Sequence, residues 1–586
     1  MKPILLSATT MAISVVFASL SWGHSAMFPD GYNFDDTNEG KSAAELAATA
    51  GVQAAASTTC SGGSASGYLC KKIDLKAFVP KAELGGGSQN LNDIWGWTDP
   101  ETGSEIAIVG RTHGTAFVDI SNAENPVLLG FLPSADGTSS WRDMKVYNDH
   151  AFIVADGGGN RDHGLQVYDL RQLRDVKPGS TLSETAHLGG FGIAHNIAIN
   201  EDTGYAYIVG SNQCSGGLYM ADISDPTAPS YAGCFSSDGY THDAQCVIYN
   251  GPDSRYTGAE ICVAYNEDTI TIVDVSNKSN PVQISRTAYS GARYTHQGWF
   301  LDDNQSILIT DDELDESNSG VNTTSYIFDV SDLQNPVELG AYVGPTSAID
   351  HNLYAKDGYV FETNYRAGLR IHSTEDIASG NMKEVAYFDT IPGSDSAQFS
   401  GTWSSYIYFE SGNIVVSDIG NGLFVLAPDW EAINNPSNDD DDVPTPTYCN
   451  AAGRSVDYEW VSKVEIGDFE NTSSGALYSD FTDQVISLDA GTSAEVTLTP
   501  DFRDNTYNEF WAIWIDFDQS KTFENSEKVF APSASSSSAV SGTLTIPADA
   551  ATGTTRMRVI MEYNNAPSAC GSFNYGEVED YSVEIQ

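Results

Sequence analysis

Four histidines recur at nearly even spacing in the first two thirds of the chain, and together they could hold a metal ion. His195, His242, His296 and His351 each open a short apolar run, at steps of about 50 residues. Asn, Asp or Gln follows each of them directly. Imidazole nitrogens and carboxylate oxygens that converge can bind a transition metal, and the metal can activate water for hydrolysis.

The equivalent positions of other repeats widen this set, and the chemistry has alternatives. The residues could bind a small polar ligand, with Arg142 pairing a carboxylate. Each histidine could instead hydrogen-bond the backbone of the next repeat without any ligand, and a wide ring would keep the histidines too far apart to share one ion. The candidate catalytic residues are His195, His242, His296, His351, Arg142 and Asp143. The candidate ligand-binding residues are Asp93, Arg142, Asp243, Gln297, Asp350 and Trp403.

A second candidate site lies near the C-terminus and contains oxygen ligands. Between residues 516 and 527, oxygen-bearing side chains fall at loop positions 1, 3, 5, 9 and 12, the spacing of an EF-hand-type calcium loop. Lys521 stands where that loop has Gly, and the preceding run is typical of a strand. The alternative is an acidic turn without an ion. The expected ligands are Asp516, Asp518, Ser520, Glu527 and the carbonyl of Thr522.

Two more acidic runs are weaker candidates for a cation-binding site. Residues 310–316 (TDDELDE) are interpreted as a solvated loop, with cation binding as the alternative. In 576–581 (GEVEDY) the carboxylates could form an oxygen cluster, or they could alternate along a strand and face solvent. The sequence contains no GxSxG, HExxH or P-loop motif, so no nucleophile or phosphate site is predicted.

The histidines belong to a repeat of four short strands. In 191–235 the runs AHNIAIN, YAYIVGS, GLYMADI and SYAGCF are rich in β-branched and aromatic residues and are bounded by turn residues. Units of this kind begin about every 50 residues, as propeller blades do. Counting gives seven units, and segment 70–80 is expected to supply the fourth strand that the last unit lacks. The sequence therefore predicts an all-β protein that contains a seven-bladed β-propeller.

The third strand of five units ends in aspartate. We expect each carboxylate to accept a hydrogen bond from the backbone of its own turn. These residues are Asp119, Asp169, Asp222, Asp274 and Asp329.

Length, charge and the N-terminus limit the class of protein. The chain has 586 residues and a formal net charge of −52, from 28 basic and 80 acidic residues. Such a surface repels nucleic acid and anionic lipid, so neither is an expected partner. Residues 1–26 carry one Lys, an apolar run and small residues, which is typical of a secretory signal peptide. No transmembrane segment is expected once the signal is removed, so the protein should be extracellular or on a bacterial cell surface.

Eight cysteines behind an export signal predict disulfides. The sequence allows 105 pairings, and proximity favours four of them. These are Cys60–Cys70, Cys214–Cys234, Cys246–Cys262 and Cys449–Cys570.

The chain divides into five expected segments. Residues 448–586 contain about seven alternating strands separated by turn signals, which predicts a β-sandwich. The acidic run DDDD with Pro and Asn precedes this domain and predicts a solvated linker. The segments are 1–26 (signal peptide), 27–59 (loosely ordered), 60–430 (propeller), 431–447 (linker) and 448–586 (sandwich).

Two family resemblances rest on specific motifs. WRDMKVY, GGLYMADIS and YTHDAQCVIYNGPD resemble the choice-of-anchor B family of secreted bacterial proteins, which is built from LVIVD-type repeats. WIDFD, TRMRV and YGEVEDY resemble the GEVED domain, a non-catalytic module of secreted and surface proteins. Neither resemblance implies a known reaction.

These observations favour a secreted or cell-surface binding, adhesion or matrix protein that is not an enzyme. The propeller would present a binding face to an extracellular glycan or protein, and the calcium-stabilised sandwich would be an accessory module. One alternative is a metal-dependent hydrolase or lyase with its site at the histidines. Another is a carbohydrate-binding propeller that uses exposed aromatic residues such as Trp95, Trp97 and Trp141.

Overall fold

The computed structural model describes most of the chain downstream of the predicted signal peptide. The described residues are 57–157, 162–301, 303–435, 448, 451–453, 455–456, 458–519, 521, 523, 527–532, 534–548, 550–573 and 575–586. The signal peptide and most of the segments predicted as loosely ordered and as a linker lie outside these ranges. Within them the structure is almost entirely β, and the chain divides into two compact units between Ile433 and Asn434. No helix in these ranges has the length and apolar character needed to cross a membrane.

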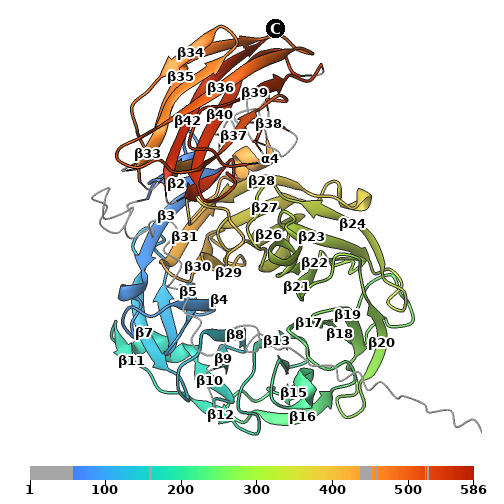
Figure 1. Cartoon of the computed structure of the whole chain (residues 1–586). Helices are drawn as coiled ribbons and strands as arrows, with labels where there is room; N and C mark the ends of the chain where they lie inside the picture. The colour runs from blue at the N-terminus through green and yellow to red at the C-terminus, as the bar shows by residue number, and fades with distance from the viewer. Residues whose placement is uncertain are drawn as a thin grey trace, which may run out of the picture. The chain divides into compact units, whose positions relative to one another are not determined.

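The first unit is a β-propeller whose antiparallel sheets radiate from a common centre (Figure 1). One contains β4 (Leu91–Thr98), β5 (Glu105–Arg111), β6 (Gly114–Asp119), β7 (Val127–Pro133) and the added β11 (Ser180–Thr181). The next contains β8 (Trp141–Tyr147), β9 (His150–Asp156), β10 (Leu165–Asp169) and β12 (Ala186–Leu188). The third contains β13 (Asn196–Asn200), β14 (Tyr205–Val209), β15 (Leu218–Asp222) and β16 (Ser230–Phe235).

The remaining propeller sheets follow the same plan. One contains β17 (Asp243–Ile248), β18 (Glu260–Tyr265), β19 (Ile270–Asp274) and β20 (Val282–Thr287). The next contains β21 (Thr295–Phe300), β22 (Ile307–Asp312), β23 (Thr324–Asp329) and β24 (Val337–Val343). A six-stranded sheet contains β25 (Asn352–Lys356), β26 (Tyr359–Thr363), β27 (Leu369–Ser373), β28 (Lys383–Phe388), β2 (Tyr68–Lys71) and β1 (Ser64–Ala65). The last contains β29 (Thr402–Tyr406), β30 (Ile414–Asp418), β31 (Gly422–Pro428) and β3 (Ile73–Pro80).

The first strand of each sheet lies nearest the centre. These strands contact one another in the order β4, β8, β13, β17, β21, β25 and β29, and β29 contacts β4 again. They therefore form a closed ring. The hydrophobic core lies between adjacent sheets, as where Tyr207 and Met220 of one sheet share a cluster with Cys262 and Val273 of the next.

The N-terminal strand closes the last sheet, as predicted. β3 pairs antiparallel with β31, and this pairing joins Ile73 to Pro428 and Pro80 to Gly422. The predicted single strand 70–80 is, however, interrupted at Lys72, which has a left-handed φ of 57°. Residues before this break belong to β2 and pair with β28 instead. The N-terminal segment therefore ties together two neighbouring sheets.

The five repeated aspartates make the predicted turn contacts. Each one accepts a hydrogen bond from the backbone N–H two residues later, at 2.8–3.1 Å. Since donor and acceptor both lie within the turn, the same Asp-containing sequence produces the same local turn contact in each of these five units. The short helices in the first unit are η2 (Lys81–Glu83), η3 (Leu170–Asp175), η4 (Cys214–Gly216), α3 (Asp315–Ser319), η5 (Ile377–Ser379) and α4 (Trp430–Asn434).

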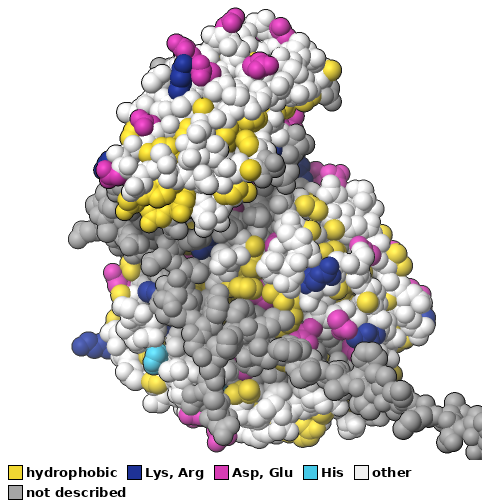
Figure 2. Space-filling model, in the orientation of Figure 1, with side chains coloured by type: hydrophobic (Ala, Val, Ile, Leu, Met, Phe, Trp, Pro, Cys, Tyr) yellow, Lys and Arg dark blue, Asp and Glu magenta, His cyan; other side chains and the backbone are white. Residues whose placement is uncertain are grey.

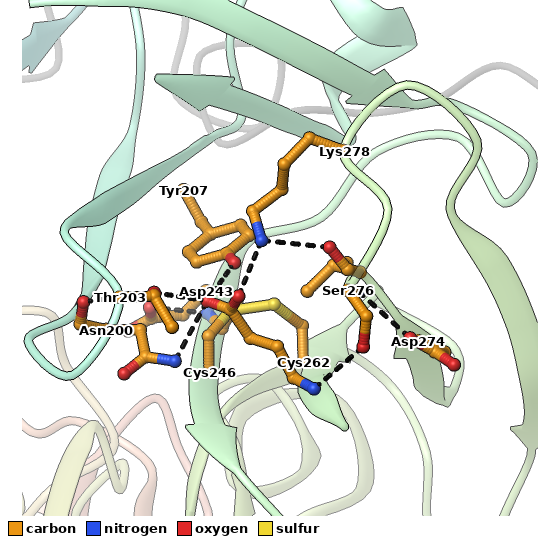
Figure 3. The surroundings of a disulfide bond; sticks show 12 residues. Asn200, Thr203, Tyr207, Asp243, Cys246, Cys262, Asp274, Ser276 and Lys278 are labelled. Carbon is orange, nitrogen blue, oxygen red and sulfur yellow. Dashed lines mark hydrogen bonds and ion pairs between the residues drawn. A yellow bond between two sulfur atoms is a disulfide. The ribbon is translucent and has the colours of Figure 1, made fainter. Parts of the chain in front are cut away.

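Three of the predicted disulfides are present. Cys60–Cys70, Cys214–Cys234 and Cys246–Cys262 are bonded. The last joins directly opposed residues of β17 and β18 (Figure 3). Cys570 is disulfide-bonded as well, while its predicted partner Cys449 lies outside the described residues.

The second unit contains two larger sheets and a short one. The first contains β34 (Phe469–Thr472), β33 (Glu459–Ile466), β36 (Ser493–Phe502) and β39 (Val540–Thr545). The second contains β35 (Tyr478–Leu488), β42 (Gly576–Ile585), β40 (Gly553–Tyr563), β37 (Glu509–Ile515) and β38 (Lys528–Phe530). β32 (Ala451–Gly453) pairs with β41 (Gly571–Phe573). One hydrophobic cluster takes residues from both larger sheets, for example Val464 and Trp511, so the core lies between them.

The acidic strand β42 does not point its carboxylates at solvent. Glu577, Glu579 and Asp580 are fully buried, so the alternative in which they alternate into solvent is wrong. Hydrogen bonds explain the burial. Glu577 accepts from the Ser479 hydroxyl at 2.8 Å, and Asp580 accepts two bonds from Arg558, each at 2.8 Å. Buried carboxylates are tolerated when partners of this kind replace water.

Candidate functional site

The four histidines form a row at the N-terminal ends of the innermost strands. His296 lies in β21, and the others stand directly before β13, β17 and β25. All four are at most 3% exposed. Successive ring centroids are 4.4, 4.1 and 4.4 Å apart in the order His195, His242, His296, His351. The alternative in which a wide ring separates them is therefore wrong, because neighbouring imidazoles are in contact.

The histidines also make the backbone contacts that were the alternative to ligand binding. The Nδ1 atom of His242 lies 2.9 Å from the carbonyl oxygen of His296, and that of His296 lies 3.1 Å from the carbonyl of His351. His351 continues the pattern with the carbonyl of Trp403 at 2.6 Å. His195 differs, since its Nδ1 contacts the Asp156 carboxylate at 2.9 Å. Each of these imidazoles thus links one sheet to a neighbouring one.

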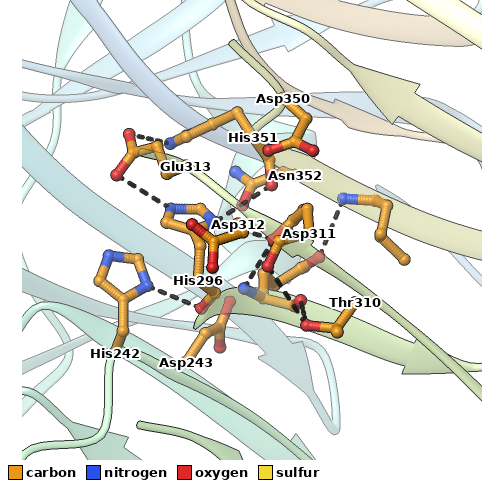
Figure 4. Close-up of polar contacts among 12 residues, drawn as sticks. His242, Asp243, His296, Thr310, Asp311, Asp312, Glu313, Asp350, His351 and Asn352 are labelled. Carbon is orange, nitrogen blue, oxygen red and sulfur yellow. Dashed lines mark hydrogen bonds and ion pairs between the residues drawn. The ribbon is translucent and has the colours of Figure 1, made fainter. Parts of the chain in front are cut away.

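The run 310–316 turns inward and brings a carboxylate to this row (Figure 4). Asp311, Asp312, Glu313, Asp315 and Glu316 are all at most 3% exposed, so the predicted solvated loop is wrong. The Glu313 carboxylate lies 3.6 Å from Nε2 of His351 and 3.9 Å from Nε2 of His296. The sequence did not single out Glu313. The available signal was the lack of Gly, Pro, Asn or Ser in the run, since a solvated turn usually contains them.

Other predicted channel residues serve the structure around the row. The Arg142 guanidinium is bonded to the carbonyl of Arg111, to His163 and to Ser134, and the described residues provide no carboxylate partner for it. Trp403 is buried, with its ring edge-on to His351 at 4.9 Å. Asp350 is 1% exposed, and burial followed by the nearby Glu316 carboxyl raises its pKa well above the usual range.

A second level of polar residues lies one position further along the innermost strands. Here Asp93, Asp143 and Asp243 surround Lys145, whose ammonium lies 2.6 Å from Asp143. Burial and the Asp143 carboxylate raise the pKa of Asp93 to about 7. Burial alone would lower the pKa of Lys145, but the three carboxylates outweigh it and raise that pKa. Gln297, at the same level, accepts a hydrogen bond from the backbone of Leu353 at 2.9 Å.

An aromatic cavity of about 410 Å³ opens at the other end of the same strands. Its aromatic lining residues are Trp95, Trp299, Tyr354, Tyr406 and Tyr408. Its polar lining residues include Lys145, Glu201, Asp243, Gln245 and Gln297. The aromatic rings support one another, since neighbouring centroids are 5.2–6.4 Å apart in tilted or edge-on pairs. The Lys145 ammonium lies 4.6 Å from the centre of the Trp95 ring.

Of the three tryptophans predicted to be exposed for carbohydrate binding, only one lines this cavity. Trp97 and Trp141 are 5% and 9% exposed and belong to the core, whereas Trp95 is half-buried and lines the cavity. Spacing alone could not separate them. Trp95 and Trp97 share one strand and one face, but the Trp97 side chain lies at the end of the strand and donates a hydrogen bond to Asp149 at 3.1 Å.

Part of the predicted calcium loop can be described. Carboxylate oxygens of Asp516, Asp518 and Glu527 lie within 4.8 Å of one another. Glu527 accepts a hydrogen bond from the backbone of Phe517 at 2.6 Å, and Asp516 accepts one from Lys521 at 3.1 Å. The other two expected ligands, Ser520 and Thr522, lie outside the described residues.

Family comparisons match parts of both units. The LVIVD repeat matches residues 191–236 and 258–288, and the GEVED domain matches residues 510–584. The two repeat and domain resemblances are therefore supported, while membership of the choice-of-anchor B family stays a prediction. No curated protein sequence matches the chain significantly.

Solved structures with some similarity are distant. Hydrazine synthase of Kuenenia stuttgartiensis is 10% identical with a TM-score of 0.39, over 55% of this chain and 91% of that chain. The outer coat vertex of COPII on membranes is 11% identical with a TM-score of 0.38, over 57% of this chain and 84% of that chain. The COPII coat assembled on membranes gives the same identity and TM-score, over 57% of this chain and 46% of that chain.

Proposed function

We propose that the chain is a secreted or cell-surface binding protein that holds a glycan in the aromatic cavity of a seven-bladed propeller. In this proposal the seven sheets whose first strands form the closed ring are the blades, and the second unit is a β-sandwich that acts as an accessory module. The export signal expected from the sequence, the disulfides and the LVIVD and GEVED matches support an extracellular location.

The observation that carries the proposal is the composition of the cavity. Ligand sites are concave and largely apolar, with a few polar groups that fix orientation. The faces of Trp95 and Trp299 would pack on the apolar face of a sugar ring, while Gln245, Asp243 and Lys145 could hydrogen-bond hydroxyl groups. The cavity volume of about 410 Å³ lies within the range of small-ligand sites and suits one or two sugar residues.

Charge favours a neutral or cationic glycan over a polyanion. The net charge is −52, and on the face shown in Figure 2 the Lys and Arg side chains stand apart from one another. Such a surface gives a nucleic acid or an anionic polymer no continuous basic patch on that face. Lys145 is already paired with Asp143, so it would not recruit an anion by itself.

The test is a glycan array probed with the full exported chain, followed by calorimetry with the glycan that binds. Tyr408→Ala should weaken binding about 10-fold, because it removes one wall of the cavity. Tyr231→Ala is the matched control, since Tyr231 is 57% exposed and lies outside the cavity. Silence on the array, together with capture of a defined protein through the same cavity, would move the proposal to a protein ligand.

Calcium in the second unit belongs to the same proposal. The grouping of Asp516, Asp518 and Glu527 supports a calcium ion there, with Ser520 and the Thr522 carbonyl as further ligands. Calcium added to chelator-treated wild type should raise its melting temperature, and Asp518→Asn should abolish this response. An unchanged melt would assign these residues to an acidic turn.

The hydrolase or lyase hypothesis receives less support. The four imidazoles are at most 3% exposed, so an extracellular polymer would not reach them. Their burial favours a resident ion over a substrate that must enter and leave.

A further inference from the structure

Three ligand-type atoms converge at the centre of the histidine row. Nε2 of His296, Nε2 of His351 and a carboxylate oxygen of Glu313 all lie within 4.8 Å of one another. In Figure 4 both imidazoles point toward the Glu313 carboxylate. His296 comes from β21, Glu313 follows β22 directly, and His351 precedes β25. The group therefore bridges two neighbouring sheets.

The backbone contacts determine which imidazole nitrogen faces Glu313 with a lone pair. A carbonyl oxygen can only accept a hydrogen bond, so Nδ1 of His296 and of His351 must each carry a proton. In the neutral ring, Nε2 is then the unprotonated nitrogen. Metal-binding histidines are commonly arranged in this way, with the second nitrogen donating to a backbone carbonyl that fixes tautomer and orientation.

The spacing suits a tetrahedral metal. Two ligand atoms bound 2.0–2.1 Å from one zinc ion lie about 3.3 Å apart in tetrahedral geometry. Nε2 of His351 lies 3.6 Å from Oε1 of Glu313 and Nε2 of His296 lies 3.9 Å from Oε2, and the three ligand atoms of the group lie within 4.8 Å of one another. Side-chain movements of about 1 Å would therefore bring them to tetrahedral spacing. Two nitrogens and one carboxylate are ligands that zinc and similar transition metals accept, whereas calcium and magnesium prefer oxygen alone.

The surroundings hold these side chains in place and exclude water. His296, Glu313 and His351 are at most 2% exposed. The Tyr365 hydroxyl donates to Glu313 at 2.6 Å and fixes its carboxylate. The imidazole of His242 lies 4.1 Å from that of His296 and has the same Nδ1–carbonyl contact, so it is the neighbouring candidate for a fourth ligand.

Burial disfavours the charged forms of two of these side chains. It lowers the pKa of His351 to about 3 and raises the pKa of Glu313 to about 8.

We propose that His296, Glu313 and His351 form a buried zinc-type metal site that ties two neighbouring propeller sheets together. The site is closed, so its ion is a structural one that enters as the protein folds. It is separate from the aromatic cavity and from the calcium loop of the second unit.

The experiment is elemental analysis and cobalt spectroscopy of the full exported chain. Protein folded with zinc should retain about one zinc per chain, and cobalt in its place should give the visible absorption of a four-coordinate ion. Glu313→Gln keeps the size of the side chain and an oxygen acceptor for Tyr365. It should weaken metal binding by at least about 100-fold, and His351→Gln should do the same.

The matched control is His195→Gln, because His195 is a member of the row that contacts Asp156 rather than the carboxylate of Glu313. It should retain the metal. A second control, Asp516→Asn with Asp518→Asn, should leave the cobalt spectrum unchanged and so exclude the second unit as the source.

Two outcomes would overturn the proposal. One is equal metal retention in wild type, Glu313→Gln and His351→Gln. The other is wild-type protein that binds neither zinc nor cobalt when folded in their presence. If both variants fail to fold, the wild-type cobalt spectrum still decides: absorption that persists in the second control supports the site, and its absence refutes it.

Discussion

The two ends of the innermost propeller strands differ sharply in the burial and contacts of their side chains, although both ends belong to the same strands. On β21, His296 is fully buried in the histidine row, while Trp299, about 10 Å further along, lines the open aromatic cavity. At the first end, side chains bond to the next sheet, which restricts them to a few polar types. At the second end, Trp299 contacts the next sheet through the ring of Tyr354, with centroids 5.2 Å apart, and this contact does not require a polar side chain. The comparison teaches that one end of a repeat maintains the ring, while the other can change to suit a ligand.

The largest effect that would test this contrast is expected from His351→Ala. The change leaves a cavity between His296 and Trp403 and removes the bond to the Trp403 carbonyl. We expect the free energy of unfolding, measured by denaturant titration with chelator present, to fall by about 4 kcal/mol. His187→Ala, at an exposed site, should cost less than about 0.5 kcal/mol. Equal losses of unfolding free energy in the two variants would show that the histidine row is no more important for stability than an exposed histidine.

The next largest effect is expected from the double variant Cys246→Ser with Cys262→Ser. The disulfide closes a segment with a sequence separation of 16 residues, and Cys246 also lines the aromatic cavity. Chain-entropy arguments give a loss of about 3 kcal/mol in unfolding free energy. Glycan binding should weaken as well, while metal content should not change. A loss of metal with intact glycan binding would show that the disulfide supports the histidine row and not the aromatic cavity.

A smaller effect is expected from Asp93→Asn, between the two ends. The pKa of Asp93 is about 7 in the folded protein against an ordinary value of 3.8. The folded state therefore holds a proton that the unfolded state has lost, so this contribution to stability is complete below about pH 4 and disappears as pH rises through 7.

Wild-type stability should accordingly fall by about 2 kcal/mol more than that of Asp93→Asn between pH 5 and pH 7. Melts of both proteins across this range measure the difference. Parallel curves would show that Asp93 is already ionised in the folded protein.

The smallest effect is expected from Trp95→Phe at the open end. The smaller ring keeps an aromatic wall but loses contact with Lys145 and part of the stacking surface. Glycan affinity should fall about 5-fold, roughly 1 kcal/mol, with unfolding free energy almost unchanged. A drop in stability as large as that of His351→Ala would mean that both ends maintain the ring.

Most of the fold could be predicted because the four-strand unit recurs as a recognisable sequence pattern. The period of the units, the Asp-containing turns and the added N-terminal strand each depend on local patterns or on simple counting. The break at Lys72 was missed, because alternation of apolar residues continues across it while the chain changes sheets.

The candidate site was predicted only in part. The histidines were found from their spacing, but Glu313 was taken for a solvated residue because acidic runs usually are exposed. Its burial depends on contacts with residues distant in sequence, such as the hydrogen bond that the Tyr365 hydroxyl donates to it. The aromatic cavity likewise requires residues from seven strands and two connections to meet. Such long-range assembly leaves no local signal.

The pairing of β3 with β31 has a consequence for the order of folding. Lys72, next to β3, donates to the carbonyl of Ala432 across a sequence separation of 360 residues. During synthesis the N-terminal strand β3 must therefore wait for β31, the last strand of the first unit, before the ring can close. Closure over such a distance is slow, and the partly folded chain keeps an open edge until then. Export before closure would confine this vulnerable interval to the compartment in which the disulfides form.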